Sequence, residues 1–436
     1  MPRLIRQIGD FIAYILIRII FSPLALMPIS WIHAIGNKLG LLLFYLLKGF
    51  RKKTLSNLSL AQGIVKDEKH LLKLAKESFQ NLAITVLEYG KLPFVRDINK
   101  VVECENPEEA QELINQGTGL IFFVGHQANW ELLFLEGTNR MPGVAIGRPI
   151  NNSFLYRYVV RMRERFGGKI FEPKQGLKEG LRALKSGKFL GIVGDQAFPS
   201  GNFTSSFLGI NAYTSTAPAL LAYKTGSPII TASIVRVKNK YKMHFSNALF
   251  PNKEKPINEE VEHMMHVCLA HLEKSIRKNP GQWLWQHNRW KQEPASITYY
   301  KFRKNPILII LPRSEKRAIE CRAILDLLKT IYPKAFLTLW APHALENSSL
   351  VSGWNYKTYK APADLFIRDY KFQLVFNFSN QTTLKNHFLS LSASEVIDHQ
   401  TLFNFAKKEN IHPDNTVEVL KKLLTRPGAL DSFYAQ

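Results

Sequence analysis

The stretch GLIFFVGHQANWE, residues 119–131, joins an apolar run to a polar turn and largely decides the fold. Residues 119–125 predict a short buried strand, because a continuous apolar run of this length is typical of a strand covered on both faces. His126 follows directly, so we expect a histidine at the carboxyl end of a strand, where open α/β sheets usually bind ligands. Imidazole is the natural general base near neutral pH, which makes His126 the first candidate for chemistry.

Glu131 lies five residues beyond His126. Five residues of straight helix rotate by about 140°, so the two side chains would not share a helix face. They can meet only if His126 lies in the turn and Glu131 in the first turn of the next helix, with Asn129 as its cap. A carboxylate there could orient the imidazole and leave the other ring nitrogen to deprotonate a hydroxyl. The spacing alone is common by chance, so a purely structural pair is the alternative.

Outward from this stretch, short apolar strands alternate with amphipathic helices. The predicted strands include residues 189–195 and 228–237, and the predicted helices are residues 66–92, 151–166, 176–186, 217–224 and 257–278. This alternation predicts an α/β fold with a mostly parallel central sheet.

The pattern restarts near residue 298, with predicted strands at 305–312, 335–342 and 371–379. A smaller C-terminal α/β module, Rossmann-like in pattern, is therefore expected. The expected boundaries are 1–60 for a membrane anchor and basic juxtamembrane segment, 61–297 for the catalytic domain and 298–436 for the module.

The most apolar part of the chain is residues 11–35, which is long enough to span a bilayer but is interrupted by Arg18, Pro23, Pro28 and His33. Residues 1–60 hold eight Lys or Arg and one acid, Asp10. This bias favours an uncleaved anchor with the rest of the protein on the cytoplasmic side. An interfacial hairpin broken at the prolines, a cleaved signal peptide and a buried soluble helix are the alternatives.

Charge and cysteine content narrow the classes of partner. The chain has 58 Lys and Arg against 35 Asp and Glu, a net charge of +23, which implies an anionic partner. No nucleic-acid-binding motif accompanies the charge, so anionic membrane lipids, a phosphorylated substrate or an acidic carrier protein are favoured over nucleic acid. Cys104, Cys268 and Cys321 are widely spaced, which argues against a disulfide framework and a zinc ribbon.

Six segments in order resemble the bacterial lipid A late acyltransferases, the lauroyl/myristoyl acyltransferase family within the lysophospholipid acyltransferase-like superfamily. The likeness covers residues 1 to about 295. Its segments are RKKTLSNLSL (51–60), GHQANWE (125–131), GRPINNSFLYRYVVRMRERFG (147–167), GDQAFPSGNFTSSFLG (194–209), TAPALLAYKTGSPII (216–230) and QWLWQHNRWK (282–291).

The resemblance implies an inner-membrane enzyme with its catalytic domain on the cytoplasmic face. It would move a fatty acyl chain from acyl carrier protein to a hydroxyl of a Kdo-bearing lipid A precursor, without metal or cofactor. His126 would be the general base and Glu131 its orienting partner. The substrate-binding residues would be Arg148, Asn151, Asp195, Gln196, Arg157 and Arg161.

Several of these residues have a simpler interpretation. Arg157, Arg161 and Arg165 are spaced i, i+4, i+8, so they form one basic stripe that could meet lipid phosphates or be a solvated helix face. Trp283 and its aromatic neighbours in the last segment suit either a membrane interface or the edge of a packed core.

Two other functions compete with lipid A acylation. One is acyl transfer to glycerol phosphate or a lysophospholipid, and the other is a non-catalytic, basic, membrane-peripheral binding protein. Residues 298–436 lie beyond the family's usual end and faintly resemble the amino-terminal half of a heptosyltransferase-type domain. We therefore expect them to form an accessory, non-catalytic module.

Overall fold

The computed structural model describes residues 2–201, 203–291 and 297–430 and divides into two compact units. The N-terminal unit comprises Met1–Leu47 and Lys66–His287, and the C-terminal unit comprises Lys48–Val65 and Asn288–Gln436. These boundaries differ from those expected, because helix α3 (Lys48–Leu60) belongs to the C-terminal unit. Lys52 of α3 donates a hydrogen bond to the Ala393 carbonyl, and Ser56 donates one to the Lys371 carbonyl.

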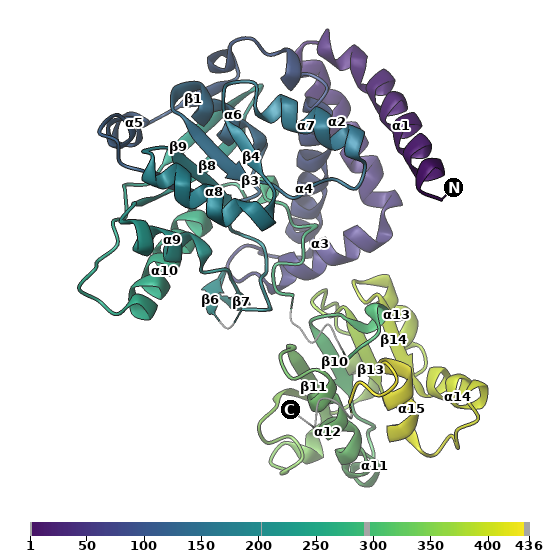
Figure 1. The fold of residues 1–436 in the computed structure, drawn as a ribbon. Helices are drawn as coiled ribbons and strands as arrows, with labels where there is room; N and C mark the ends of the chain where they lie inside the picture. Colours follow the sequence, from purple (N-terminus) through teal and green to yellow (C-terminus); the bar gives the residue numbers. More distant parts are fainter. Residues whose placement is uncertain (1, 202, 292–296, 431–436) are drawn as a thin grey trace. The chain divides into compact units, whose positions relative to one another are not determined.

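The N-terminal unit is built on a seven-stranded sheet in the order β1-β9-β8-β2-β5-β3-β4 (Figure 1). Only β8 and β9 pair antiparallel, so the predicted α/β fold with a mostly parallel sheet is confirmed. The strands are β1 (Val102–Cys104), β2 (Leu120–Val124), β3 (Gly143–Ile146), β4 (Lys169–Phe171), β5 (Phe189–Val193), β8 (Ile229–Val237) and β9 (Lys240–Phe245).

The central strand β2 is buried along its whole length, which explains its unbroken apolar sequence. A separate two-stranded hairpin is formed by β6 (Thr204–Phe207) and β7 (Ile210–Tyr213). The helices that surround the sheet are α4 (Glu68–Glu88), α5 (Glu108–Asn115), α6 (Glu131–Arg140), α7 (Ser153–Arg163), α8 (Pro173–Lys185), α9 (Ala217–Thr225) and α10 (Ile257–Lys278).

Two apolar helices precede this sheet in the chain. Helix α1 (Pro2–Phe21) ends before a 3-10 turn at Ser22–Ala25, and α2 (Ile29–Leu46) begins directly after Pro28. The prolines therefore divide the apolar stretch 11–35 between two helices, because a proline fits a helix start but breaks a helix interior.

The two helices differ in what covers them. Leu4–Ala25 and Ile29–Leu46 are both long and apolar enough to cross a membrane, but the first is almost wholly exposed. Helix α2 packs closely on α4, where any side chain at Gly40 would collide with the backbone of Gln80. The exposed apolar surface of α1 indicates membrane anchoring.

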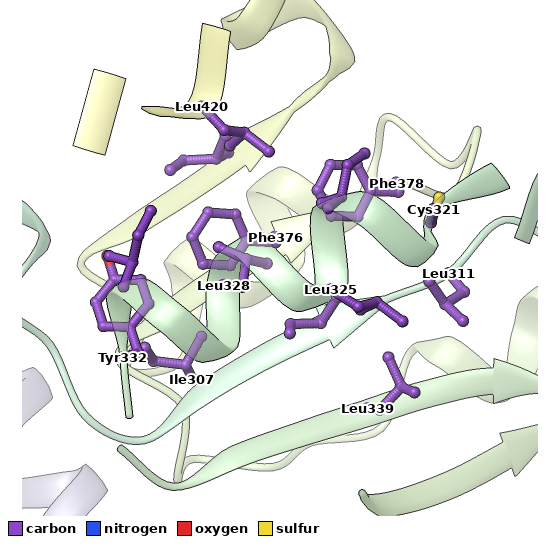
Figure 2. Close-up of a cluster of buried hydrophobic side chains, with 14 of the residues drawn as sticks. Ile307, Leu311, Cys321, Leu325, Leu328, Tyr332, Leu339, Phe376, Phe378 and Leu420 are labelled. Atoms are coloured by element: carbon purple, nitrogen blue, oxygen red, sulfur yellow. The ribbon is translucent and has the colours of Figure 1, made fainter. Parts of the chain in front are cut away.

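The C-terminal unit is a second α/β fold with a five-stranded, wholly parallel sheet in the order β12-β11-β10-β13-β14. The strands are β10 (Ile307–Ile310), β11 (Leu337–Pro342), β12 (Asn355–Tyr359), β13 (Leu374–Asn377) and β14 (Glu395–Asp398). Besides α3, its helices are α11 (Glu315–Glu320), α12 (Arg322–Ile331), α13 (Leu384–Ser390), α14 (His399–Lys408) and α15 (Thr416–Leu424). Figure 2 shows its core, in which Leu325 and Leu328 of α12 lie against Ile307 and Phe376 of the sheet.

Candidate active site

Two neighbouring parallel strands bring His126 and Asp195 together. Val124 of β2 is paired with Val193 of β5, and each candidate residue lies two positions beyond its member of that pair. His126 Nδ1 is 2.7 Å from Asp195 Oδ1, and the His126 backbone N–H donates to Asp195 Oδ2 at 2.7 Å. The strand register thus fixes a histidine–carboxylate pair at the carboxyl edge of the sheet.

Asp195 is held as an anion. It is 2% exposed, and Trp283 Nε1 donates a further hydrogen bond to its Oδ2 at 2.8 Å. Burial alone would raise the pKa of Asp195, but the charge of His126 and these hydrogen bonds outweigh burial and lower it to about 2. Because an ionised carboxylate can only accept hydrogen bonds, the proton of a neutral His126 lies on Nδ1. The lone pair of the neutral imidazole is then on Nε2, and this nitrogen lies 3.3 Å from Gln196 Nε2.

Glu131 has other partners than the imidazole. It is the first residue of α6, as the spacing argument required, and Asn129 Oδ1 accepts a hydrogen bond from its backbone N–H. Arg163 of α7 donates two hydrogen bonds to its carboxylate, at 2.7 and 2.6 Å, and Tyr89 donates a third at 2.6 Å. The expectation that Glu131 would hydrogen-bond to His126 is corrected here: Asp195 accepts that bond, while the guanidinium and phenol engage Glu131.

Glu131 still acts on His126 through its charge. Burial favours a raised pKa for Glu131, but the charge and hydrogen bonds of Arg163, the Tyr89 hydroxyl and the charge of His126 together lower it. Glu131 is therefore ionised within electrostatic range of the imidazole.

The turn that carries His126 is held by side chains of α4. Ala128 has a left-handed backbone, with φ of 44°, and its carbonyl accepts hydrogen bonds from Asn81 and Thr85. Glu88 receives hydrogen bonds from Asn129 and from Tyr241 of β9 and contacts His33 Nε2 at 2.6 Å. A turn that needs an unusual backbone conformation is thus fixed by buried polar groups.

The segment after α10 fixes the same turn from its other side. Gln127 forms a β-bridge with Trp283, and the Leu284 backbone N–H donates to the His126 carbonyl at 3.1 Å. Trp283 and Trp285 are at most 1% exposed. These tryptophans therefore lie at the edge of a packed core and not at a membrane interface. Trp283 also positions Asp195 through its hydrogen bond.

A cavity of about 510 Å³ opens beside His126. Polar residues at one part of its wall are Tyr89, His126, Glu131, Arg148, Arg163 and Gln196, and the remainder is largely apolar, with Phe122, Leu133, Phe134, Ile146, Phe189, Met243 and Phe245 among its residues. This volume and this mixture of an apolar wall with few polar groups are typical of small-molecule sites.

The structure distributes the other predicted residues unevenly. Arg148 and Gln196 line the cavity, whereas Arg157 and Arg161 line a separate shallow hollow on the outer side of α7. Asn151 is exposed and, among the described residues, is not part of the cavity wall; its neighbour Asn152 caps α7 by accepting hydrogen bonds from two backbone N–H groups.

Sequence reasoning missed Arg163. Arg157, Arg161 and Arg165 repeat at helical spacing and therefore predicted a basic stripe. Arg163, between Arg161 and Arg165, does not share that spacing. Arg163 projects from a different face of α7, and only the position of Glu131 gives it a role. A buried glutamate at a helix start is the available signal, because such a group requires a cationic partner.

Within residues 2–201, 203–291 and 297–430, no group of three or more His, Cys, Asp or Glu side chains could hold a metal ion.

Comparison with known proteins identifies the family. The model of the bacterial lipid A biosynthesis acyltransferase family matches residues 3–292. The chain belongs to this family. It is therefore an acyltransferase-family enzyme of lipid A biosynthesis, and the resemblance seen in the six segments is confirmed.

Characterised relatives are distant in sequence. The lipid A biosynthesis palmitoleoyltransferase of Escherichia coli K12 is 25% identical over 231 residues, which cover 51% of this chain and 73% of the relative. The lipid A biosynthesis lauroyltransferase of the same organism is 24% identical over 275 residues, which cover 62% of this chain and 89% of the relative. The family match ends at residue 292, so nearly all of the C-terminal unit after α3 lies outside it.

Proposed function

We propose that this protein transfers a fatty acyl chain from acyl carrier protein to a hydroxyl group of a Kdo-bearing lipid A precursor, with His126 as the general base. The observation that carries the proposal is the His126–Asp195 pair beside a largely apolar cavity, in a chain of the lipid A acyltransferase family. A base at the mouth of an apolar cavity suits a reaction between a hydroxyl and a long hydrocarbon thioester.

The proposed step is acyl transfer with His126 as proton shuttle. Nε2 takes the proton from the acceptor hydroxyl while the oxygen attacks the thioester carbonyl carbon. The tetrahedral oxyanion then collapses, the C–S bond breaks, and the imidazolium returns the proton to the leaving thiolate. Asp195 keeps the Nδ1 proton in place and stabilises the imidazolium, and Arg148 at the cavity wall is a candidate to bind the developing negative charge.

Glu131 and Arg163 have a supporting role in this proposal. The two-hydrogen-bond contact fixes α6 against α7 at the cavity wall, where the ionised Glu131 lies within electrostatic range of His126. The Gln196 amide contacts His126 Nε2 at 3.3 Å, so the acceptor hydroxyl would have to take its place to lose a proton to Nε2.

The proposed location is the bacterial inner membrane, with the catalytic unit on the cytoplasmic face. The exposed apolar surface of α1 and the excess of basic residues in the first 60 positions support it. Acyl carrier protein as donor and anionic lipids as surroundings fit the net charge of +23.

The test is transfer from labelled acyl carrier protein to a tetra-acylated, Kdo-bearing precursor, followed by mass spectrometry of the product. His126→Ala is expected to lose at least ~100-fold in rate. The control is His263→Ala, which removes an exposed histidine of α10 and should leave the rate unchanged.

Other outcomes separate the parts of the proposal. Failure of the wild type on this acceptor, with success on glycerol phosphate or a lysophospholipid, would keep the base and replace the acceptor. Equal rates for wild type and His126→Ala would remove His126 from the chemistry.

A further inference from the structure

Helix α3 and the segment before β10 together form a basic and aromatic surface within the C-terminal unit. We call it the basic-aromatic patch and define it by Phe50, Lys53, Tyr300, Lys301 and Lys304. Tyr300 is 81% exposed and Phe50 is 50% exposed, although both are aromatic. Lys53 Nζ lies 5.3 Å from the centre of the Phe50 ring, and Lys304 Nζ lies 6.0 Å from that of Tyr300. Lys52 of α3 donates to the Ala393 carbonyl and Lys301 pairs with Glu395, so both segments lie at the start of β14 and form one surface.

The lysines of the patch are crowded together. Burial and then the charge of Lys304 lower the pKa of Lys53, and burial likewise lowers the pKa of Lys304. Next to the patch, burial followed by the charges of Arg51 and Lys48 lowers the pKa of Lys52. The carboxylate of Glu395 lies close to these lysines. It pairs with Lys301 at 3.1 Å, and its charge acts to raise the pKa of Lys52 and of Lys304. Positive charge therefore exceeds what this carboxylate neutralises, and an anionic partner would relieve the repulsion.

Chain connectivity limits how far the start of α3 can lie from the end of α2. Helix α3 begins at Lys48, and α2 ends at Leu46. Since a fully extended chain spans at most about 3.6 Å per residue, Lys53 lies within about 25 Å of the end of α2. A membrane that meets the exposed apolar residues at the end of α2, Tyr45 and Leu46, is thus within reach of α3.

We propose that the basic-aromatic patch binds the anionic lipid headgroups of the membrane that holds α1, and so holds the C-terminal unit against the bilayer surface. The proposal rests on the membrane location given above. Exposed tyrosine and phenylalanine side chains settle at the headgroup level, and each lysine near an anionic surface strengthens binding by about fivefold. A second consequence is that α3 joins the N-terminal helices to a unit most of which lies beyond the family match, which ends at residue 292.

The test is a lysine footprint on the full chain in proteoliposomes. The protein is reconstituted in vesicles of phosphatidylcholine alone or with 30% phosphatidylglycerol, where ~30% is chosen to resemble an anionic leaflet. Flotation is measured first, and a water-soluble acetylating reagent is then applied, with mass spectrometry at each lysine. We expect about fivefold or greater protection of Lys53, Lys301 and Lys304 in the anionic vesicles. Lys407 and Lys408 of α14 are exposed internal controls and should react equally in both.

Matched variants make the result specific. The double variant Lys301→Glu/Lys304→Glu should abolish protection of Lys53, whereas Lys407→Glu/Lys408→Glu should retain it. Lys301→Gln/Lys304→Gln should give an intermediate loss if the first variant folds poorly beside Glu395. Raising the salt concentration to about 0.5 M should also weaken protection, because exposed charges are screened.

The remaining outcomes overturn the proposal in distinguishable ways. A chain that does not float with either vesicle refutes the membrane location and this proposal with it, whereas acyl transfer is measured independently. A chain that floats equally with both vesicles, with identical labelling of the patch, refutes the patch alone. Protection that persists in Lys301→Glu/Lys304→Glu would assign it to something other than charge.

Discussion

The two α/β units contrast at the carboxyl edges of their sheets. In the N-terminal unit, neighbouring strands β2 and β5 end in His126 and Asp195, and a cavity of about 510 Å³ lies beside them. In the C-terminal unit, neighbouring strands β13 and β14 end in Asn377 and Asp398. Both sheets therefore place polar side chains where open α/β sheets usually bind ligands.

What differs is how these polar groups are satisfied. Asn377 accepts a hydrogen bond from Ser379 at 2.6 Å, and Asp398 caps α14 and pairs with Lys385. Asn377 and Asp398 are thus engaged by residues of their own unit, whereas His126 lines a cavity. The comparison shows that the fold supplies the edge, and that particular residues decide whether the edge can do chemistry.

The largest expected effect is the loss of the carboxylate beside His126. Asp195→Asn should lower the rate of acyl transfer by ~100-fold or more, because an amide can donate to Nδ1 and favour the wrong tautomer. The matched variant Asp398→Asn changes the same group at the other sheet. Steady-state rates with the labelled donor give the comparison, and equal losses in both variants would mean that Asp195 acts only through stability.

The same carboxylate should make stability depend on pH. The pKa of Asp195 is about 2 in the folded chain, below the ordinary value of 3.8. A depressed pKa contributes stability that is present above the ordinary value and is lost as pH falls toward 2, by about 2 kcal/mol in total. Denaturation of the N-terminal unit between pH 5 and 2 should therefore show a steeper decline for wild type than for Asp195→Asn. Parallel curves would refute the assigned shift.

The pair formed by Glu131 and Arg163 should matter chiefly for stability. Glu131→Ala leaves a largely buried guanidinium unpaired, which costs about 3–5 kcal/mol. Arg163→Lys keeps the charge but loses the two-bond geometry, so a smaller loss is expected. Chemical denaturation measures both variants. If Glu131→Ala were as stable as wild type but inactive, Glu131 would belong with the catalytic groups.

The sequence predicts many of the strands and helices, and the contacts that it does not predict have a common cause. Strands β2, β5 and β8 and helix α10 were predicted from apolar runs and helical spacing, which are local signals. The His126–Asp195 contact was not predicted, because it depends on β2 and β5 being neighbours although 69 residues separate the two side chains. The role of Arg163 and the packing of α3 in the C-terminal unit likewise depend on tertiary contacts. Local patterns identified His126 and Glu131 as candidates and the family resemblance added Asp195, but neither showed which of them meet.

A substitution in the cavity wall should alter donor preference by a smaller factor. Gly191 of β5 lines the cavity, and a Cβ there would lie 3.4 Å from that of Ala145, an ordinary contact. Gly191→Ala should therefore fold and reduce the space for a hydrocarbon chain. We expect a several-fold shift toward shorter acyl donors, since each methylene in an apolar pocket is worth about 1–3 kcal/mol. Competition between donors of different length measures the shift, and an unchanged preference would place the chain elsewhere.

The smallest expected effect tests the other half of the comparison. Because Asp398 is engaged by Lys385 and by the Thr401 backbone and hydroxyl, Asp398→Asn removes an ion pair but keeps a cap, and should destabilise the start of α14 by at most about 1 kcal/mol. Acyl transfer should remain within about twofold of wild type, since the amide still caps the helix and the reacting groups lie in the other unit. A loss of tenfold or more, in a chain whose thermal stability is unchanged, would make the C-terminal sheet edge a participant in the reaction. Both α/β units would then take part in acyl transfer. Asn377 and Asp398, at the edge of the C-terminal sheet, would then be expected to act on a substrate and not only on their own neighbours.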